Sequence, residues 1–175
     1  LIVCAMFGLW QPSLQTLALM SFSVVLSLAI GISLGVLCAL NDRLERILRP
    51  ILDAMQTMPA FVYLIPVVLF FGVARVPAVI STIIYAVPPV IRLVNLGIRE
   101  VQPAAVEAGR AFGATRAQLL TKVQLPLALP AILAGVNQTI MMALGMVVIA
   151  AMVGAAGLGR EVFLSLQRLK VGQAF

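Results

Sequence analysis

Long apolar runs dominate the pattern of the chain, and short polar segments separate them. A helix that crosses a bilayer needs about 20 consecutive apolar residues. We therefore predict a membrane-spanning helix within each long run. Prolines inside the second run predict a kinked or broken helix there, because proline removes a helix hydrogen bond. The runs are Leu14–Leu40, Ala54–Ala74 with Pro59 and Pro66, Val76–Ile98 with Pro88 and Pro89, and Val123–Gly159.

The last apolar run and the two ends of the chain do not fit the pattern of one complete span each. Val123–Gly159 carries no charge over 37 residues, which exceeds one span. We expect part of it to lie at an interface or to re-enter the membrane, with a turn at Gly154–Gly159. Leu1–Leu9 is too short to span. Residues 1–10 are therefore expected to be the tail of a truncated helix, residues 11–175 one transmembrane domain, and a final C-terminal helix is expected to be missing.

Two glycines in the first run are spaced for helix packing. Gly31 and Gly35 lie four residues apart, and this small-xxx-small spacing lets a neighbouring helix approach closely. A chance pair in a glycine-tolerant membrane helix is an equally good interpretation of the pattern.

The polar segment Arg99–Lys122 is predicted to contain a short helix and a sharp turn. Pro103 suits the first turn of a helix, where a missing N–H does no harm. Good helix formers follow up to Phe112. Gly113 then supplies the left-handed conformation that ends helices.

A second short helix is predicted directly after this turn. Thr115 followed by Gln118 is a capping-box pattern, and the helix runs into Leu125-Pro126. The first helix carries mostly small side chains, so it is slim enough to enter a groove on a partner. A tight connection between two spans is the alternative interpretation.

The distribution of basic residues predicts an orientation. If Arg99–Lys122 is cytoplasmic, then Asn41–Asp53 lies on the same side, while Arg75 and Gly154–Phe175 lie outside. Eight of the twelve basic residues are then cytoplasmic, including Arg92 near the end of its span. This agrees with the excess of Lys and Arg in cytoplasmic loops.

Composition supports a membrane protein and excludes several kinds of site. The chain is 62% hydrophobic and only 10% charged. Charged residues make up about 25% of an ordinary soluble domain. The net charge of +6 is spread over loops, which makes nucleic acid a weak expectation. Histidine is absent, acidic residues do not cluster, and Cys4 and Cys38 lie in apolar runs. We therefore expect no catalytic residues, no metal site and no cofactor bound by this chain.

The polar segment resembles the "EAA" loop of binding-protein-dependent ABC importer permeases, whose pattern is E-A-A-x3-G-x9-I-x-L-P. Gly109 replaces the third alanine and Val123 replaces the isoleucine, while the spacing is intact. Glycine inside a helix costs about 1 kcal/mol relative to alanine, so the stiffness of this helix is in question. The matching residues are Glu107, Ala108, Gly109, Gly113, Val123, Leu125 and Pro126, within a loop of about residues 99–126.

Other segments are similar to the permease subunit of glycine betaine/proline importers, the quaternary-amine subgroup of that family. They are Met55–Gly72, Tyr85–Val101, Lys122–Gly159 and Leu166–Phe175. This resemblance implies an all-α type I ABC importer transmembrane domain, of about five helices in this sequence, in the cytoplasmic membrane of a prokaryote.

The resemblance also implies partners. Two copies of a separate ATPase would hydrolyse ATP and dock onto the loops of two permeases, most simply a homodimer. An extracytoplasmic binding protein would deliver the solute. The matched loop residues would then couple ATP-driven closure to the pore. Glu107 would pair with a basic group or cap a helix, the alternative being a solvated surface carboxylate.

Candidate residues for the solute pathway are fewer. Tyr63 offers an aromatic face to a quaternary ammonium group. Asn137 and Gln138 are polar within an apolar run, and such groups line a cavity or hydrogen-bond between helices. An ATP-independent secondary transporter or channel is the alternative function. It would require membrane-embedded ion relays, and only Arg92 lies near a span.

Overall fold

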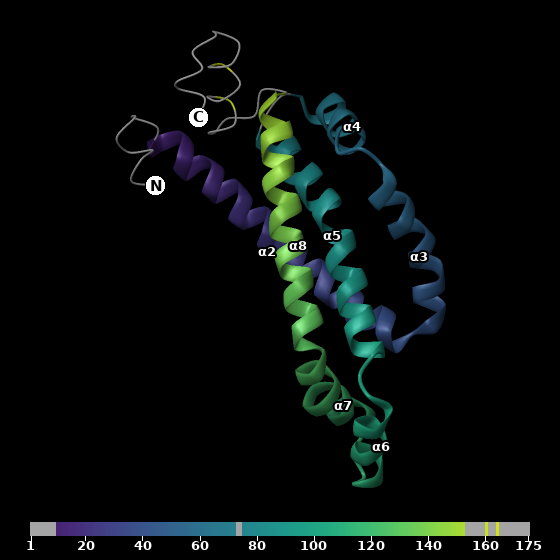
Figure 1. Ribbon diagram of the computed structural model, residues 1–175. Coiled ribbons are helices and arrows are strands. Elements are labelled where there is room, and N and C mark those ends of the chain that lie inside the picture. The colour runs from purple at the N-terminus through teal and green to yellow at the C-terminus, as the bar shows by residue number, and fades with distance from the viewer. Residues whose placement is uncertain (1–9, 73–74, 153–159, 161–163, 165–175) are drawn as a thin grey trace. The chain divides into compact units, whose positions relative to one another are not determined.

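A computed structural model describes residues 10–72, 75–152, 160 and 164, and the regular structure of this part is entirely helical. The all-α prediction is confirmed. Residues 1–9, predicted as a helix tail, and the predicted turn at Gly154–Gly159 lie outside the described residues. Figure 1 shows the helices along the chain. They are α2 Trp10–Leu40, α3 Asp42–Thr57, α4 Phe61–Phe71, α5 Arg75–Arg99, α6 Pro103–Ala111, α7 Arg116–Leu119, the π-helical segment Leu120–Gln124, and α8 Leu125–Met152.

Among the described residues, three helical stretches are long and apolar enough to cross a membrane: Trp10–Leu40, Val76–Arg99 and Arg116–Ala150. They contain the first and third predicted runs and most of the fourth. The proline pair of the third span stays inside α5. The last run forms one continuous helix as far as Met152. This continuous helix leaves no re-entrant loop before that residue, and the expectation that part of the run lies at an interface stays a prediction.

The second predicted span is broken rather than kinked, and its first half starts earlier than expected. The break lies at residues 58–60, around Pro59, whereas Pro66 stays inside α4. The preceding helix α3 begins at Asp42. Asn41 starts it, because its side-chain Oδ1 accepts hydrogen bonds from the backbone N–H groups of Arg43 and Leu44 at 3.0 and 3.4 Å. Asparagine is among the residues preferred at this capping position.

The chain divides into two compact units. The loop unit comprises Leu28–Gln56 and Val87–Thr139, and the terminal unit comprises Leu1–Ser27, Thr57–Ala86 and Ile140–Phe175. In the terminal unit, the core contains Leu64 of α4, Ala78 of α5 and Met146 of α8, with Tyr85 packed against it. The side chains of Ser23, Ser81 and Thr82 donate hydrogen bonds to carbonyls of the preceding helical turn, which satisfies these buried hydroxyls.

The loop unit is built around α5, whose residues Val90, Val94 and Ile98 are almost completely buried. Glycines bring the neighbouring helices close to it. A Cβ on Gly35 of α2 would lie 2.7 Å from Val94 Cβ, and one on Gly135 of α8 would lie 3.3 Å from Leu93 Cβ. Close packing through small residues is how membrane helices associate. The structure thus favours the packing interpretation of Gly31 and Gly35 over chance.

Candidate functional site

The candidate site is the segment between α5 and α8, here called the coupling loop, which comprises residues 100–124. Its first helix, α6, begins as the sequence predicted. Gln102 is the N-cap with extended backbone, and Pro103 occupies the first turn. The Gln102 carbonyl accepts hydrogen bonds from the backbone N–H groups of Ala105 and Val106 at 3.0 and 3.4 Å. The proline therefore costs no hydrogen bond at this position.

A Schellman turn ends α6 at Gly113. The Ala114 N–H donates to the Gly109 carbonyl at 3.1 Å, and the Gly113 N–H donates to the Arg110 carbonyl at 2.9 Å. The backbone φ angle of Gly113 is positive, which is the left-handed conformation that the sequence predicted. A Cβ there would meet no atom within 4 Å. A larger residue would therefore be disfavoured by backbone strain and not by a clash.

The predicted capping box is present at the start of α7. The Gln118 N–H donates to Thr115 Oγ1 at 3.3 Å, and the Thr115 N–H donates to Gln118 Oε1 at 2.9 Å. However, α7 is not a separate second helix. It comprises one turn and continues through the π-helical segment into α8, so the outgoing half of the loop has no break.

Gly109, which departs from the family pattern, has a packing role. A Cβ at this position would lie 2.7 Å from Leu119 Cδ1 and 3.6 Å from Val123 Cγ2. Leu119 is itself buried, with only 6% of its surface exposed. The glycine therefore lets α6 pack directly on α7, and this contact offsets the stiffness that glycine removes from the helix.

The coupling loop is anchored to the core of the loop unit by apolar side chains. Val106 of α6, Leu120 of the π-helical segment and Leu125 at the start of α8 all pack against the cluster that contains Ile98 and Val101. Burial of each such side chain stabilises the arrangement by about 1–2 kcal/mol. Figure 1 shows α6 and α7 side by side beyond the end of α5.

Arg99, the last residue of α5, holds the start of the loop. Its guanidinium donates hydrogen bonds to the Cys38 carbonyl at 2.8 Å and to Asn95 Oδ1 at 2.9 Å, and pairs with Asp42 at 2.7 Å. A cation beside the carbonyls at the C-terminus of α2 is favourable because of the helix dipole. Nothing in the sequence indicated that Arg99 reaches Cys38, 61 positions away.

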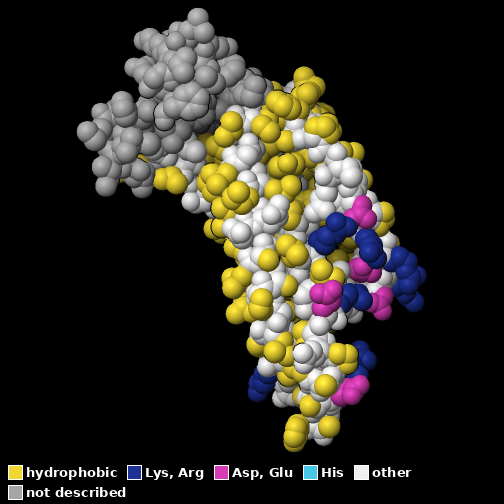
Figure 2. Space-filling model, viewed as in Figure 1, with side chains coloured by type: hydrophobic (Ala, Val, Ile, Leu, Met, Phe, Trp, Pro, Cys, Tyr) yellow, Lys and Arg dark blue, Asp and Glu magenta, His cyan; other side chains and the backbone are white. Residues whose placement is uncertain are grey.

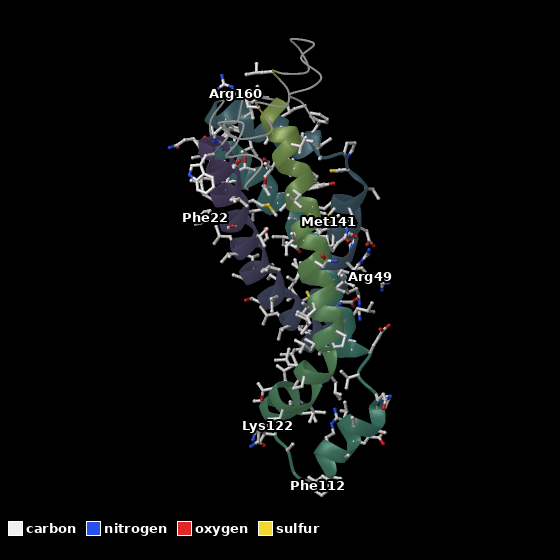
Figure 3. The ribbon with its side chains drawn as sticks, turned by 60° about the vertical axis from the view of Figure 1, so that its left-hand side comes forward. Phe22, Arg49, Phe112, Lys122, Met141 and Arg160 are labelled. Carbon is white, nitrogen blue, oxygen red and sulfur yellow. The ribbon has the colours of Figure 1, made fainter. Side chains whose placement is uncertain are left out.

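Several side chains near the tip of the coupling loop are exposed to solvent and form no ion pair with another described residue. Glu107 and Ala108 are exposed, and Glu107 makes no ion pair with another described residue. A hollow of about 260 Å³ beside the loop is lined by Glu107 and Arg110 among others. Phe112 points away from the unit at the tip (Figure 3) with 92% of its surface exposed. Phe112 is not among the site residues predicted from the sequence, although an aromatic residue just before a turn glycine is a usable signal.

The remaining residues of the EAA pattern are either half-buried or exposed. Val123 and Leu125 are half-buried, whereas Pro126 is exposed. Leu125 supports the loop by packing on the core. The exposed positions are the ones available to a partner.

The predicted pathway residues lie elsewhere. Tyr63 belongs to the terminal unit, where its ring lies 5.8 Å from that of Tyr85 between centroids. Asn137 and Gln138 lie in the loop unit, on exposed positions of α8. Neither amide makes a hydrogen bond to another helix within the described part of the chain.

Comparisons with known proteins agree with this architecture. Residues 31–174 match the family described as "binding-protein-dependent transport system inner membrane component". The chain is 54% identical to the glycine betaine transport system permease protein OpuAB of Bacillus subtilis, covering 94% of this chain and 58% of the relative. It is 51% identical to the glycine betaine/proline betaine permease ProW of Escherichia coli, covering 99% and 49%. The chain thus spans about half of the length of these relatives.

Solved structures give the same fold. The inward-facing MetNI methionine ABC transporter aligns with a TM-score of 0.81 at 27% identity, covering 92% of this chain and 81% of that one. An amino acid ABC transporter aligns with a TM-score of 0.78 at 21% identity, covering 97% and 82%. The predicted type I importer fold is confirmed, and the family match favours an importer permease over an ATP-independent transporter. The chain belongs to the family of binding-protein-dependent transport system inner membrane components.

Proposed function

We propose that this chain is the membrane core of the permease subunit of an ATP-driven importer, and that its coupling loop docks onto a separate ATPase. The observation that carries this proposal is the construction of the loop. A Schellman turn ends α6 and a capping box starts α7, while Val106, Leu120 and Leu125 anchor the loop and Phe112 is exposed at its tip. A loop of anchored helices transmits a displacement, whereas a flexible linker would absorb it.

The surroundings of Phe112 suggest the chemistry of the docking pocket. Exposed Arg110 and Arg116 flank the aromatic ring in sequence, with Glu107 as the nearest acidic residue along α6. A partner that fits has an apolar pocket with an acidic rim. Aromatic residues that enter such pockets often dominate the affinity of an interface.

The proposed solute is a small zwitterion with an alkylated nitrogen, of the glycine betaine class. The support comes from the relatives, which are permeases for glycine betaine, proline betaine and carnitine. Two ATPase copies that hydrolyse ATP, an extracytoplasmic binding protein and a second permease would complete the system. The loop then faces the cytoplasm of a prokaryote, in agreement with the excess of basic residues on that side. Tyr63, Asn137 and Gln138 remain candidates for the pathway.

Competed uptake tests the function. The full-length permease is expressed with its ATPase and binding protein in cells that lack uptake of compatible solutes, and labelled glycine betaine is followed at raised osmolarity. We expect ATP-dependent uptake that excess carnitine or proline betaine reduces. Uptake of none of these solutes, with all subunits at the membrane, would contradict the proposal.

Phe112→Ala tests the docking site. Because the side chain is exposed, we expect no loss of permease stability, but an ATPase affinity about 30-fold lower, which corresponds to about 2 kcal/mol for a central aromatic contact. Phe70→Ala is the matched control, since Phe70 is 85% exposed but lies in the terminal unit. Equal ATPase binding by both variants would rule out the pocket.

A further inference from the structure

The outward face of α3 combines basic and apolar side chains and is not covered by the described chain. Arg43 and Arg46 are exposed in the first turns, and Ile47 and Ile51 follow with 64% and 52% of their surfaces exposed. These positions share one side of the helix, opposite buried Leu52. Figure 2 shows the charged side chains gathered over α3.

The acidic residues of α3 are already paired. Glu45 pairs with Arg49 at 3.9 Å, Asp42 with Arg99 at 2.7 Å, and Asp53 with Arg92. Gln56 accepts a further hydrogen bond from Arg92 at 2.8 Å.

Arg43 and Arg46 make no ion pair with any described residue. Although α3 carries equal numbers of acidic and basic side chains, the charge that it presents outward is therefore positive. Its natural counterpart is an anion.

The two ion pairs to α5 fix the direction of α3. Asp42 pairs with the last residue of α5, while Asp53 pairs with Arg92, seven residues earlier. Seven helical residues correspond to about 10 Å. Starting at Arg99, where the spanning stretch ends, α3 therefore runs back along α5. Along its outward face the arginines come first, nearest to that end, and the isoleucines follow farther from it.

We propose that this face is a binding site for an anionic phospholipid of the surrounding bilayer. The phosphodiester lies against Arg43 and Arg46, and an acyl chain follows Ile47, Pro50 and Ile51. The order of the chemistries favours a lipid over a protein partner, because a phospholipid has its charge at the surface and hydrocarbon directly beneath it. Arginine also matches phosphate geometry through its planar set of donors.

Fluorescence quenching by brominated lipid tests the site. Full-length permease with its ATPase, with and without Ile47→Trp, is reconstituted into phosphatidylcholine vesicles that contain a minor fraction of phosphatidylglycerol. One of the two lipids is brominated on its acyl chains. The difference in tryptophan emission between the two proteins reports on position 47 alone. Both leaflets have the same composition, so the orientation of the protein does not affect the result.

We expect phosphatidylglycerol to quench beyond its mole fraction, by a factor of up to about five for each arginine near the surface. Arg43→Gln/Arg46→Gln should abolish this preference, and Arg43→Lys/Arg46→Lys should keep part of it. Lys122→Gln, which removes an exposed cation outside α3, is the matched control and should leave the lipid preference unchanged. Equal quenching by both lipids, or a preference that survives the double glutamine variant, would overturn the proposal. Absence of quenching by either lipid would also overturn it, since a protein would then cover the face.

Discussion

Gly31→Ala tests whether the close approach of α2 to α5 determines the stability of the loop unit. The Cβ of an alanine at this position would overlap Val90 Cγ1, and Val90 is completely buried. The remaining neighbours are not a problem, since Val90 Cβ and the Val87 carbonyl oxygen would lie at 3.4 and 3.5 Å. A single methyl group of Val90 is therefore the obstacle.

The expected magnitude follows from two opposing contributions. Overpacking of a close-packed site costs about 1–3 kcal/mol, and the overlap with Val90 places this substitution at the upper end. Alanine recovers up to about 1 kcal/mol of helix propensity relative to glycine. We therefore expect Gly31→Ala to lower the free energy of unfolding by about 2 kcal/mol.

The partner substitution Val90→Ala removes the obstructing methyl groups. Alone it should cost about 2 kcal/mol, because it leaves a void in the core. In the double variant the new methyl at position 31 fills part of that void. The two costs should then fall short of additivity by about 2 kcal/mol, within the range seen for residues in contact.

Equilibrium unfolding of the full-length permease in mixed micelles, at increasing mole fraction of SDS, measures these values. Gly145→Ala serves as the control, because a Cβ on this α8 glycine meets no atom within 4 Å and the change should be neutral or stabilising. The reasoning is refuted if Gly31→Ala is as stable as the parent, or if the effects of Gly31→Ala and Val90→Ala simply add.

Three further predictions concern the coupling loop and α8. Arg99→Gln removes the charged hydrogen bond to the Cys38 carbonyl. The loss should lower stability by about 2 kcal/mol in the same unfolding method, and no change would contradict this role. Gly113→Val should cost about 2 kcal/mol of backbone strain and weaken ATPase docking, whereas Gly113→Asn should retain most of both. If both Gly113 variants lose ATPase binding equally in a pull-down, backbone strain at position 113 is not the cause. Asn137→Leu/Gln138→Leu should leave stability unchanged and reduce solute uptake, and unaltered uptake would remove both residues from the pathway.

Local sequence signals predicted the elements that depend on local physics. Helix spans follow from the length of apolar runs. The ends of α6 follow from Pro103 and Gly113, because the backbone preferences of proline and glycine do not depend on distant contacts. The capping box at Thr115 is equally local, since both partners lie within four residues. None of these features requires knowledge of which helices meet.

The features that the sequence did not predict depend on contacts between distant segments. The position of α3 rests on ion pairs with Arg92 and Arg99, which lie 39 and more residues away. The glycine at position 109 looked like a weakness of α6 until its contact with Leu119 was known. The charge or size of a residue indicates what kind of neighbour it favours, but only the folded chain determines which residue becomes that neighbour.

The continuity of α7 with α8 illustrates this difference and bears on how the loop works. A second short helix was predicted to run into Leu125-Pro126, yet the helix continues beyond it. It widens to π geometry just before the proline, where the Leu125 N–H donates to the Leu120 carbonyl. Because Pro126 has no N–H, this wider segment accommodates it without ending the helix. The two limbs of the loop therefore differ: residues 100–102 between α5 and α6 are not helical, whereas the outgoing limb is helical from Arg116 onward. A displacement of α7 therefore reaches α8 through continuous helical backbone, whereas a displacement of α6 reaches α5 through side-chain packing and the non-helical residues 100–102.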